Sequence, residues 1–518
     1  MTTNKHALIR VFLAILFTLF ATAQASAAIY YVDAVNGKDT NPGSESLPWK
    51  HAPAMQGWSG VDSNPIKAGD TVKFKRGCTW NETSICPTVS GTAKRPITYT
   101  AYGTGADPIF TGVTTTALRL NAWSYHKDAV YSHYDPVQVN AVFYDNLPLV
   151  CDPQSSPGQN KWHWDKNTGL LFINIGKDPN GLNIEYSHWK PNIVLHFVNY
   201  YIIEHIEFKK NECLLSVYKS VRPIIRNCTF HLASGYAAIS LKYAEQFVID
   251  GCHIYDIGLS GYDHGIYLAQ QNNDGIVSNN LIHDIVGGGL HFWKGSNPFG
   301  TSNTIFINNI IYNCSRALIL YSNANNNKFY NNILFNNDYT MPAIHVCENG
   351  TANNIFRNNV IGGKCLEIFK FENCPVQDIN YNIYWKDLSK APASWPYRDR
   401  YIEFVRNDLN VFKEKIYGYF DNNESSWNAW IEFTRNITKN ENGKEIPCDI
   451  NSIRKDPLFK GINEYYPASA SSPMVNTGVE NPYGQTLSID SSWPSSILLT
   501  TQSGQKNIGP YEFRATAP

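Results

Sequence analysis

The segment IVSNNLIHDIVGGGLHFWKG, residues 276–295, contains the pattern from which the fold of this chain can be predicted. Its apolar residues alternate with other residues as in a β-strand, but two adjacent asparagines interrupt the pattern. The same pattern returns at intervals of roughly 23–29 residues, which is the range of solenoid repeats. The other copies are IIRNCTF (224–230), VIDGCHI (248–254), IFINNII (305–311), KFYNNIL (328–334), IFRNNVI (355–361) and INYNIYW (379–385).

The recurring asparagines mark a turn that every coil repeats. A second short apolar strand precedes each copy, so one coil contains at least two strands, and successive coils stack them in parallel. At a sharp turn, Asn tolerates unusual backbone angles and caps free peptide groups. Stacked amides can also bond to one another, so we predict a ladder of buried side chains. The aligned positions are Cys228, Cys252, Asn280, Asn309, Asn332, Asn359 and Asn382.

The first 27 residues have the features of a secretory signal peptide. Lys5 and Arg10 precede an apolar run from Val11 to Phe20, and Ala25-Ser26-Ala27 supplies small residues for cleavage. No later stretch reaches the roughly 18 consecutive apolar residues of a membrane span. We therefore expect a protein that is secreted, whether to the periplasm, the cell surface or the medium.

The charges of the chain are nearly balanced. The formal net charge is −1, and loss of Lys5 and Arg10 with the signal peptide leaves −3. This balance argues against a nucleic acid or an anionic membrane as a partner, and we expect a monomer. Among the eleven cysteines, two pairs are close enough in sequence to be disulfide candidates. These pairs are Cys78 with Cys86 and Cys365 with Cys374, whereas Cys228 and Cys252 are expected to be buried thiols.

Segments near both ends add a family resemblance. They are YYVDAVNGKDTNPGSESLPWKHAPA (30–54), AGDTVKFKRG (68–77) and RPITYTAYGTGADPIFTG (95–112), then DINSIRKDPLF (449–459), SSPMVNTGVE (471–480) and IGPYEF (508–513). They resemble the first and closing coils of the secreted right-handed parallel β-helix repeat proteins of the pectate lyase-like superfamily, which are relatives of polysaccharide lyases. The resemblance implies a right-handed helix and a polysaccharide partner.

We therefore predict one all-β domain over residues 28–518, a right-handed parallel β-helix with a small helical insertion near the C-terminus. A leucine-rich horseshoe is excluded, because regularly spaced leucines and intervening helices are missing from 200–385. In the insertion, Trp427 and Trp430 fit an amphipathic helix packed on the solenoid. The predicted parts are N-terminal coils (28–112), central coils (113–395), a mostly helical insertion (396–448) and a closing coil (449–518).

Outward positions of the second strand carry unusual chemistry for a solvated sheet face. Residues between two inward apolar positions point outward, and there the same positions of neighbouring coils hold histidines, rings and charged groups. Rings that stack on sugar faces beside convergent polar groups are typical of a carbohydrate site. One file contains Tyr267, His291, His345 and Glu367, the next contains Trp293, Tyr321 and Phe369, Lys294 follows a strand, and His264 and Arg316 precede strands.

This set of groups favours β-elimination on an acidic, uronate-containing polysaccharide. That reaction needs a cation near the sugar carboxylate, a base for the adjacent proton and an acid for the leaving oxygen. We expect Arg316 or Lys294 to neutralise the carboxylate, and His291, His345 or Tyr267 to exchange protons. The alternative for each histidine is a structural side chain bonded to a neighbour. The residues expected to bind the sugar are Trp293, Tyr321, Glu367, Phe369 and His264.

A second constellation consists of Asp256 and Asp284, each four places past the aligned turn position. Carboxylates stacked one coil apart, ~4.8 Å, can hold Ca²⁺, and the resemblance implies Ca²⁺ as a cofactor of lyases on this fold. The same pair could serve a retaining glycoside hydrolase. Turns also favour Asp for local bonding, so a purely structural role is the competing interpretation.

Three functions therefore remain open from the sequence. A polysaccharide lyase is the first, and a glycoside hydrolase on the same fold is the second. The third is a non-catalytic carbohydrate-binding or cell-envelope surface protein that keeps only the rings.

Overall fold

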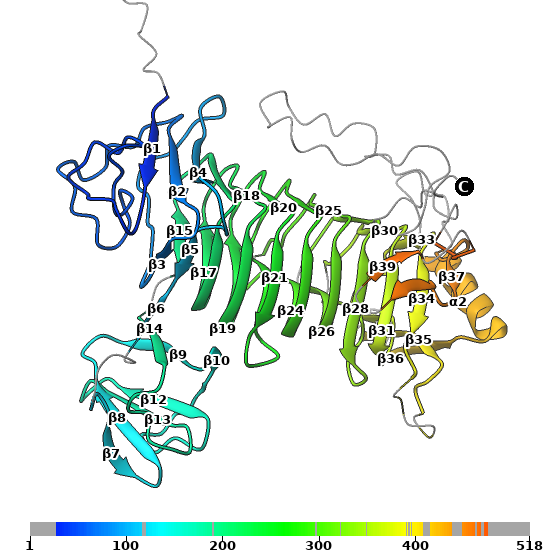
Figure 1. The fold of residues 1–518 in the computed structure, drawn as a ribbon. Coiled ribbons are helices and arrows are strands. Elements are labelled where there is room, and N and C mark those ends of the chain that lie inside the picture. The colour runs from blue at the N-terminus through cyan, green and yellow to red at the C-terminus, as the bar shows by residue number, and fades with distance from the viewer. Residues whose placement is uncertain are drawn as a thin grey trace, which may run out of the picture.

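The computed structural model describes residues 27–474 except for 116–120, 189–190, 296–297, 322, 349, 390, 392–393, 395, 408–414, 438–447, 462–463 and 468–470. Most of this part of the chain winds into a long solenoid whose strands lie side by side from coil to coil (Figure 1). The predicted parallel β-helix is confirmed. The predicted signal peptide, apart from residue 27, lies outside the described residues, as does the predicted closing coil after residue 474.

One wall of the solenoid is an eleven-stranded sheet, here called sheet A. Every pairing in it is parallel. Its strands in chain order are β1 (Ile29–Val32), β2 (Thr71–Lys75), β4 (Ile97–Tyr102), β16 (Tyr201–Glu204), β18 (Ile224–Arg226), β20 (Val248–Asp250), β23 (Ile276–Ser278), β25 (Ile305–Ile307), β27 (Lys328–Tyr330), β30 (Ile355–Arg357) and β33 (Asp378–Asn380).

The opposite wall is a seventeen-stranded sheet, here called sheet B. Several of its strands are long and bend, so one strand contributes to two faces of a coil. Its strands are β3 (Thr79–Trp80), β5 (Ile109–Thr111), β15 (Ile193–His196), β17 (Glu207–Tyr218), β19 (Thr229–Lys242), β21 (His253–Ile257), β22 (His264–Ala269), β24 (Leu281–Trp293), β26 (Ile310–Tyr321), β28 (Ile333–Asp338), β29 (Ile344–Cys347), β31 (Val360–Cys365), β32 (Phe369–Glu372), β34 (Ile383–Lys386), β35 (Arg400–Asn407), β36 (Lys415–Asp421) and β37 (Ile453–Arg454).

The turn after each sheet A strand carries the predicted asparagine ladder. Nδ2 of Asn280 donates to Oδ1 of Asn309 over 2.9 Å, and Asn309 donates to Asn332 over 3.0 Å. Asn359 and Asn382 continue the ladder at 3.0 Å per step. Each accepting Oδ1 also receives the backbone N–H of the asparagine one coil earlier. The ladder is therefore confirmed, and it satisfies buried polar groups that would otherwise be costly.

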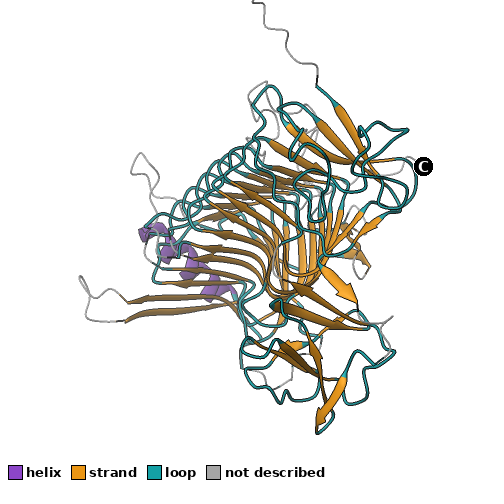
Figure 2. Cartoon of the chain, turned by 90° about the vertical axis from the view of Figure 1, so that its left-hand side faces the viewer, coloured by secondary structure: helices purple, strands orange, loops and turns teal. Residues whose placement is uncertain are grey.

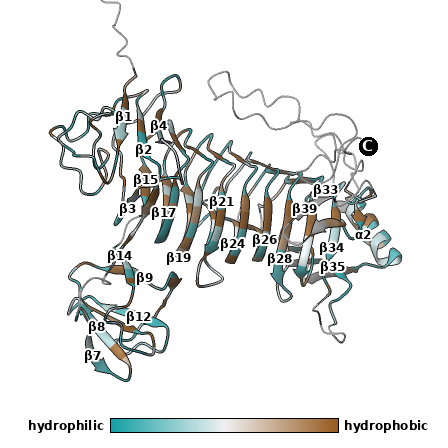
Figure 3. Cartoon of the chain, viewed as in Figure 1, coloured by the Kyte–Doolittle hydropathy of each residue, from teal (hydrophilic) through white to brown (hydrophobic). Residues whose placement is uncertain are grey.

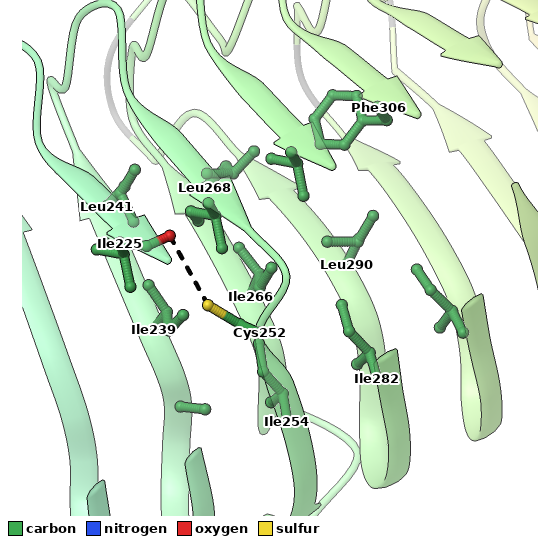
Figure 4. Packing of buried hydrophobic residues seen from close by; sticks show 14 of the residues in the cluster. Ile225, Ile239, Leu241, Cys252, Ile254, Ile266, Leu268, Ile282, Leu290 and Phe306 are labelled. Atoms are coloured by element: carbon green, nitrogen blue, oxygen red, sulfur yellow. Dashed lines mark hydrogen bonds between the residues drawn. The ribbon is translucent and has the colours of Figure 1, made fainter. Parts of the chain in front are cut away.

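Apolar side chains fill the space between the sheets. Phe306 stacks on Phe329 with ring centroids 4.7 Å apart, and Phe329 stacks on Phe356 at 4.5 Å. Isoleucines and leucines of neighbouring coils form similar files (Figure 4), and apolar segments recur on strand after strand along the solenoid (Figure 3). Because each coil places similar apolar side chains at the same positions, neighbouring coils pack in the same way. The core therefore continues along the solenoid from coil to coil.

All eleven cysteines carry free thiols, so the disulfide candidates are wrong. Sγ of Cys78 instead lies 3.6 Å from Oδ1 of Asp33, and Sγ of Cys374 lies 3.3 Å from the carbonyl oxygen of Val346. The expected buried thiols are confirmed. Cys228 and Cys252 are each 1% exposed, and Sγ of Cys252 lies 3.7 Å from the carbonyl oxygen of Ile225 (Figure 4).

Residues 113–188 do not form coils, so the prediction of central coils over 113–395 is wrong for this stretch. Its strands pair mainly antiparallel and project beside the solenoid (Figure 1). At Asp145 and Asn146 both φ angles are left-handed, 53° and 65°, as in the two-residue turns that reverse a hairpin. The strands are β6 (Val113–Thr115), β7 (Ser124–Lys127), β8 (Val130–Tyr134), β9 (Val139–Tyr144), β10 (Leu147–Pro148), β11 (Val150–Cys151), β12 (Lys161–Asp165), β13 (Leu170–Asn174) and β14 (Ile184–His188).

This antiparallel module has its own core. Trp123, Val142, Trp162, Leu171 and Ile173 pack together in a cluster separate from the solenoid core. The expected single domain is therefore a solenoid with an inserted module.

The region 396–448 contains one described helix, α2 (Glu424–Ile437), but it is not mostly helical. β35 and β36 form an antiparallel hairpin that projects from the coils (Figure 2). Ile402 and Phe404 pair with Phe369 and Phe371, so this segment extends the inward file of the solenoid. The expected packing role of Trp427 and Trp430 is confirmed, since they are 4% and 0% exposed.

A short hairpin of β38 (Phe459–Gly461) and β39 (Glu464–Pro467) follows. Among the described residues, the structure contains no helix that is long and apolar enough to cross a membrane.

Candidate functional site

Parallel pairing in sheet B fixes which outward side chains are neighbours. Tyr267 pairs with His291, and His291 pairs with Ile319. Ile319 pairs with His345, which in turn pairs with Lys370. The geometry of the predicted file is therefore confirmed for Tyr267, His291 and His345, while their roles remain predictions.

Glu367 and Phe369 do not belong to this surface, which corrects their assignment as sugar-binding residues. Phe369 pairs with Ile344 and Ile402 and is fully buried in the core. Glu367 is also fully buried, and its Oε1 lies 2.9 Å from Nη1 of Arg400. The consecutive apolar residues 368 and 369 break the period-two pattern, so the strand starts three residues later than the sequence alignment placed it.

The outward histidines are not exposed to solvent. His291 is 9% and His345 is 6% exposed, and His264 joins them at 4%. The Nε2 atom of His264 lies 2.6 Å from Nδ1 of His291, and the backbone N–H of Gly288 donates to Nδ1 of His264 over 3.2 Å. A Cβ at Gly288 would lie 3.3 Å from that Nδ1 and 2.9 Å from Cδ1 of Ile319, so the close approach favours glycine.

The N–H of Gly288 determines the tautomers of both neutral rings. Because Nδ1 of His264 accepts a hydrogen bond from the backbone N–H of Gly288, its Nε2 carries the ring proton and donates to His291. Nδ1 of His291 is then an acceptor, and its Nε2 carries the proton. That Nε2 is buried and has no hydrogen-bond partner among the described residues. The ring of His291 therefore presents an unsatisfied N–H donor.

All three rings are neutral at neutral pH. Burial lowers the pKa of His264 to about 4. Burial, followed by repulsion from His264 and Arg316, lowers the pKa of His291 well below its ordinary value. Burial also lowers the pKa of His345, although its hydrogen bond to Glu372 opposes this.

Arg316 supplies a cation beside the rings. It pairs with Gly288 across the coils, and its charge acts on His264, His291 and His345. Nη2 of Arg316 lies 2.8 Å from Sδ of Met341, while its buried Nε has no partner among the described residues. We name His264, Tyr267, His291, Arg316, Tyr321 and His345 the histidine cluster.

His345 lies between a phenol and a carboxylate. Its Nε2 is 3.0 Å from Oε2 of Glu372, and its Nδ1 is 3.4 Å from the hydroxyl of Tyr321. Nε2 of neutral His345 therefore donates to the carboxylate and Nδ1 accepts. The hydrogen bond to His345 lowers the pKa of Glu372 to about 2, so this carboxylate is ionised at neutral pH.

Two carboxylates that the sequence analysis missed lie on this face. Nζ of Lys370 is 3.5 Å from Oε2 of Glu372 and 3.6 Å from Oε2 of Glu403. Lys370 pairs with His345, and Glu403 pairs with Lys370. The outward file therefore continues from His345 through Lys370 to Glu403. The alternation of apolar and charged residues in FKFE (369–372) predicts that Lys370 and Glu372 point outward. Glu403 could not be found in this way, because it lies in the segment 396–448 that was expected to be mostly helical.

The remaining predicted residues surround the histidine cluster. Tyr267 has its ring 5.1 Å from that of His291. Trp293 is 38% exposed, and its ring lies 6.0 Å from that of Tyr321. Nζ of Lys294 lies 3.6 Å from Oε2 of Glu348. Exposed Trp293 thus remains available for stacking, and Lys294 is partly neutralised.

Asp256 and Asp284 have the geometry of turn residues rather than that of a calcium site. Their φ angles are 54° and 56°. Oδ2 of Asp284 lies 2.7 Å from Nδ1 of His283, and its Oδ1 accepts from Asn313. Within the described residues, no group of three or more His, Cys, Asp or Glu side chains could hold a metal ion. Both carboxylate oxygens of Asp284 already have partners, so Asp256 and Asp284 do not fit a Ca²⁺ ion.

Comparisons with known proteins agree with the fold. The family model described as right handed beta helix region matches residues 180–306. A search of curated proteins finds no match.

Solved structures give distant likenesses. The complex of XylC with xylose is 14% identical, covers 69% of this chain and 83% of that chain, and has a TM-score of 0.46. Pectate lyase Pel9A is 11% identical, covers 95% and 97%, and has a TM-score of 0.46. A GH136 lacto-N-biosidase from Eubacterium ramulus is 13% identical, covers 74% and 67%, and has a TM-score of 0.39. Similarities this distant say nothing about the reaction. The parallel sheets give this chain the fold of a parallel β-helix, and the family model that matches residues 180–306 describes a right-handed one.

Proposed function

We propose that the protein is a secreted, carbohydrate-active enzyme that cleaves an acidic, uronate-containing polysaccharide by β-elimination at the histidine cluster. The observation that carries the proposal is the pair of buried, unsatisfied donors, Nε2 of His291 and Nε of Arg316. Buried polar groups without partners are rare and need an explanation. A carboxylate that reaches both atoms would satisfy them.

The sugar carboxylate is the group that these donors suit. Arg316 is a cation and binds a carboxylate through charge-assisted hydrogen bonds. His291 is neutral, so its N–H polarises an oxygen without giving up a proton, as an electrophile does. Abstraction of the proton beside the carboxylate places extra negative charge on these same oxygens. The two donors would therefore stabilise the transition state more than the ground state.

The base in this proposal is Tyr321, supported by His345 and Glu372. As the Tyr321 oxygen takes the proton from the sugar carbon, its hydroxyl proton passes to Nδ1 of His345. The carboxylate of Glu372, 3.0 Å from Nε2, stabilises the resulting imidazolium. The electron pair of the broken C–H bond forms the carbon–carbon double bond, and the glycosidic C–O bond breaks. The leaving oxygen takes a proton from Tyr321, which recovers one from His345.

A glycoside hydrolase is the second candidate, and Glu372 and Glu403 favour it. Both carboxylates lie within 3.6 Å of the same Lys370 ammonium. The two Oε2 atoms are therefore at most about 7 Å apart, and separations below this limit include those found between the carboxylates of glycosidases. We infer that Glu372 and Glu403, rather than Asp256 and Asp284, are the candidate pair of catalytic acids, because Asp256 and Asp284 are turn residues.

A polysaccharide panel tests the proposal. Polygalacturonate, alginate and neutral glycans would be incubated with the protein and assayed for ultraviolet absorbance of an unsaturated product and for reducing ends. Elimination is expected to give both signals on a uronate polymer only. Reducing ends without the absorbance would establish hydrolysis, and binding without either product would establish a non-catalytic role; both outcomes contradict the lyase.

Substitution at the base makes the test specific. Tyr321→Phe removes the hydroxyl but keeps the ring, so we expect a rate loss on the order of a hundredfold or more. His126→Ala is the matched control, because His126 is exposed on β7 of the antiparallel module. Unchanged activity in Tyr321→Phe would remove Tyr321 from the mechanism.

A further inference from the structure

A cavity of about 480 Å³ lies where the N-terminal coils meet the antiparallel module. Separate parts of the chain line it, including Trp58 from the first loops, Glu82 and Cys86 from the next coil, and His188 from β14. None of these residues belongs to the histidine cluster. We propose that this cavity is a second carbohydrate site, which binds one neutral sugar unit of a glycan chain.

The polar side of the cavity is arranged around His188. Its Nε2 lies 3.0 Å from Oδ2 of Asp135, a carboxylate that is only 8% exposed and whose Oδ1 accepts from the N–H of Val137. Nε2 of His188 therefore carries a proton. Nδ1 of the same ring faces Oε1 of Glu82 at 3.9 Å, which is too long for a hydrogen bond. Two neighbouring hydroxyl groups of one sugar suit this pair, because one can donate to the carboxylate of Glu82 and the other can donate to Nδ1 of His188.

Glu82 lies at a turn in the wall of the cavity. Its φ angle is 52°, a left-handed value that other turn residues of this fold, such as Asp256 and Asp284, share. The turn therefore brings an ionisable side chain to the cavity.

The apolar side of the cavity is a rigid indole. Nε1 of Trp58 donates to the carbonyl oxygen of Asp62 over 3.0 Å, and the ring meets Trp49 edge to face at 5.2 Å. A Cβ at Gly60 would lie 2.0 Å from Cζ2 of Trp58, so the backbone at Gly60 closes tightly on the ring. A fixed, half-buried indole beside hydrogen-bonding groups is suited to the apolar face of a sugar.

Volume and charge define the class of ligand. The cavity is far larger than the roughly 30 Å³ that one water occupies, and it lies within the usual size range of ligand pockets. The described lining contains the carboxylate of Glu82 but no lysine or arginine. An anionic sugar would meet repulsion here, in contrast to the surroundings of Arg316, so the expected ligand is neutral. This site does not depend on the reaction proposed for the histidine cluster.

Ligand-observed NMR tests the site directly. Saturation transfer would be measured from the full-length mature protein to methyl glucoside, methyl galactoside, methyl mannoside and methyl xyloside, with galacturonate as the charged comparison. At least one neutral glycoside is expected to bind. Trp58→Ala and the isosteric Glu82→Gln should each weaken the affinity for this glycoside at least tenfold. Arg316→Ala and the exposed control Glu45→Gln should leave that affinity unchanged.

Cys86 provides a second, local measurement. Its half-buried thiol lines the cavity, while Cys151 is exposed on the module. The bound sugar is expected to slow alkylation of Cys86, as followed by mass spectrometry, without slowing alkylation of Cys151. The proposal is overturned if no neutral glycoside binds, if both cavity variants bind normally, if galacturonate protects Cys86 better than the neutral glycosides do, or if Arg316→Ala abolishes binding of the neutral glycoside.

Discussion

His264 and His291 are joined by a hydrogen bond of 2.6 Å, and the backbone N–H of Gly288 fixes its direction. A peptide N–H can only donate, so a single backbone group sets the tautomers of two side chains from neighbouring coils. The neutral N–H that remains at His291 is therefore oriented before any ligand binds. Such preorganised donors contribute more to catalysis than donors that must reorient.

Loss of this donor is expected to reduce the rate. His291→Ala should lower kcat on the uronate polymer by about 10²–10³, as removal of one oxyanion-stabilising donor does. Because His291 is 9% exposed, the variant should also lose roughly 1–3 kcal/mol of stability. Steady-state kinetics at a temperature well below the melting point of the variant would separate the two effects. Wild-type kcat in the folded variant would assign His291 a structural role.

The neutral histidines predict how stability depends on pH. Histidine in an unfolded chain has a pKa of about 6.5, whereas burial lowers the pKa of His264 to about 4. As the pH falls, protons bind the unfolded chain first, so this stabilisation is complete above about pH 6.5 and is lost toward pH 4. The midpoint of urea unfolding should decrease over this window. His264→Asn should flatten the slope, and an unchanged slope would contradict the prediction.

Asp449 predicts the opposite pH dependence at the C-terminal end. Burial raises its pKa to about 6, although Tyr384, Trp430 and Ser452 all donate to it. The folded state binds this proton more tightly than the unfolded chain. The contribution is therefore complete below about pH 4 and is lost as the pH rises through 6. Asp449→Asn should remove this component from the unfolding profile, whereas Asp62→Asn in a loop should not.

The asparagine ladder predicts a stability cost that is local in origin. Asn309→Ala leaves the amide of Asn280 and the carbonyl of Asn332 without their side-chain partner, so we expect a loss of roughly 1–3 kcal/mol. Chemical denaturation would measure it. Asn167→Ala is the matched control, because Asn167 is exposed in a turn of the module. Equal stability of the two variants would contradict the role of the ladder.

Phe369 and Trp293 should behave in opposite ways. Phe369 is fully buried, so Phe369→Ala should cost about 3–5 kcal/mol through the cavity that it leaves. Trp293 is 38% exposed, so Trp293→Ala should change stability little but raise KM by weakening sugar stacking. Thermal melting and kinetics on both variants would check the pair. A stable Phe369→Ala variant with a raised KM would restore the assignment made from the sequence.

Much of the fold was predictable because stacking repeats the same requirement in every coil. Each turn needs a side chain that forms hydrogen bonds with the same residue type in the next coil. Asn280, Asn309 and Asn332 meet this need, and they recur at a spacing that is visible in the sequence. The inward–outward alternation likewise placed Tyr267, His291 and His345 in one file. Both are local rules, so they are visible in a single sequence.

Other features depend on where strands start and which direction they take. The doubled apolar residues Ile368 and Phe369 satisfy two registers equally well, and only packing against Ile344 and Ile402 chooses between them. The turn at Asp145 and Asn146 reverses the chain within a separate core, although the strand before it, VNAVFY (139–144), is apolar like the solenoid strands.

The solenoid, its ladder and the outward file can be predicted from the sequence alone, because each follows from a pattern that recurs in every coil. The chemistry of that surface depends on the tertiary structure. Burial makes three histidines neutral, a backbone N–H at Gly288 sets the tautomers of His264 and His291, and pairing across coils brings Glu372 to His345. Desolvation and hydrogen-bond direction depend on neighbours distant in the chain, so no pattern within one repeat encodes them.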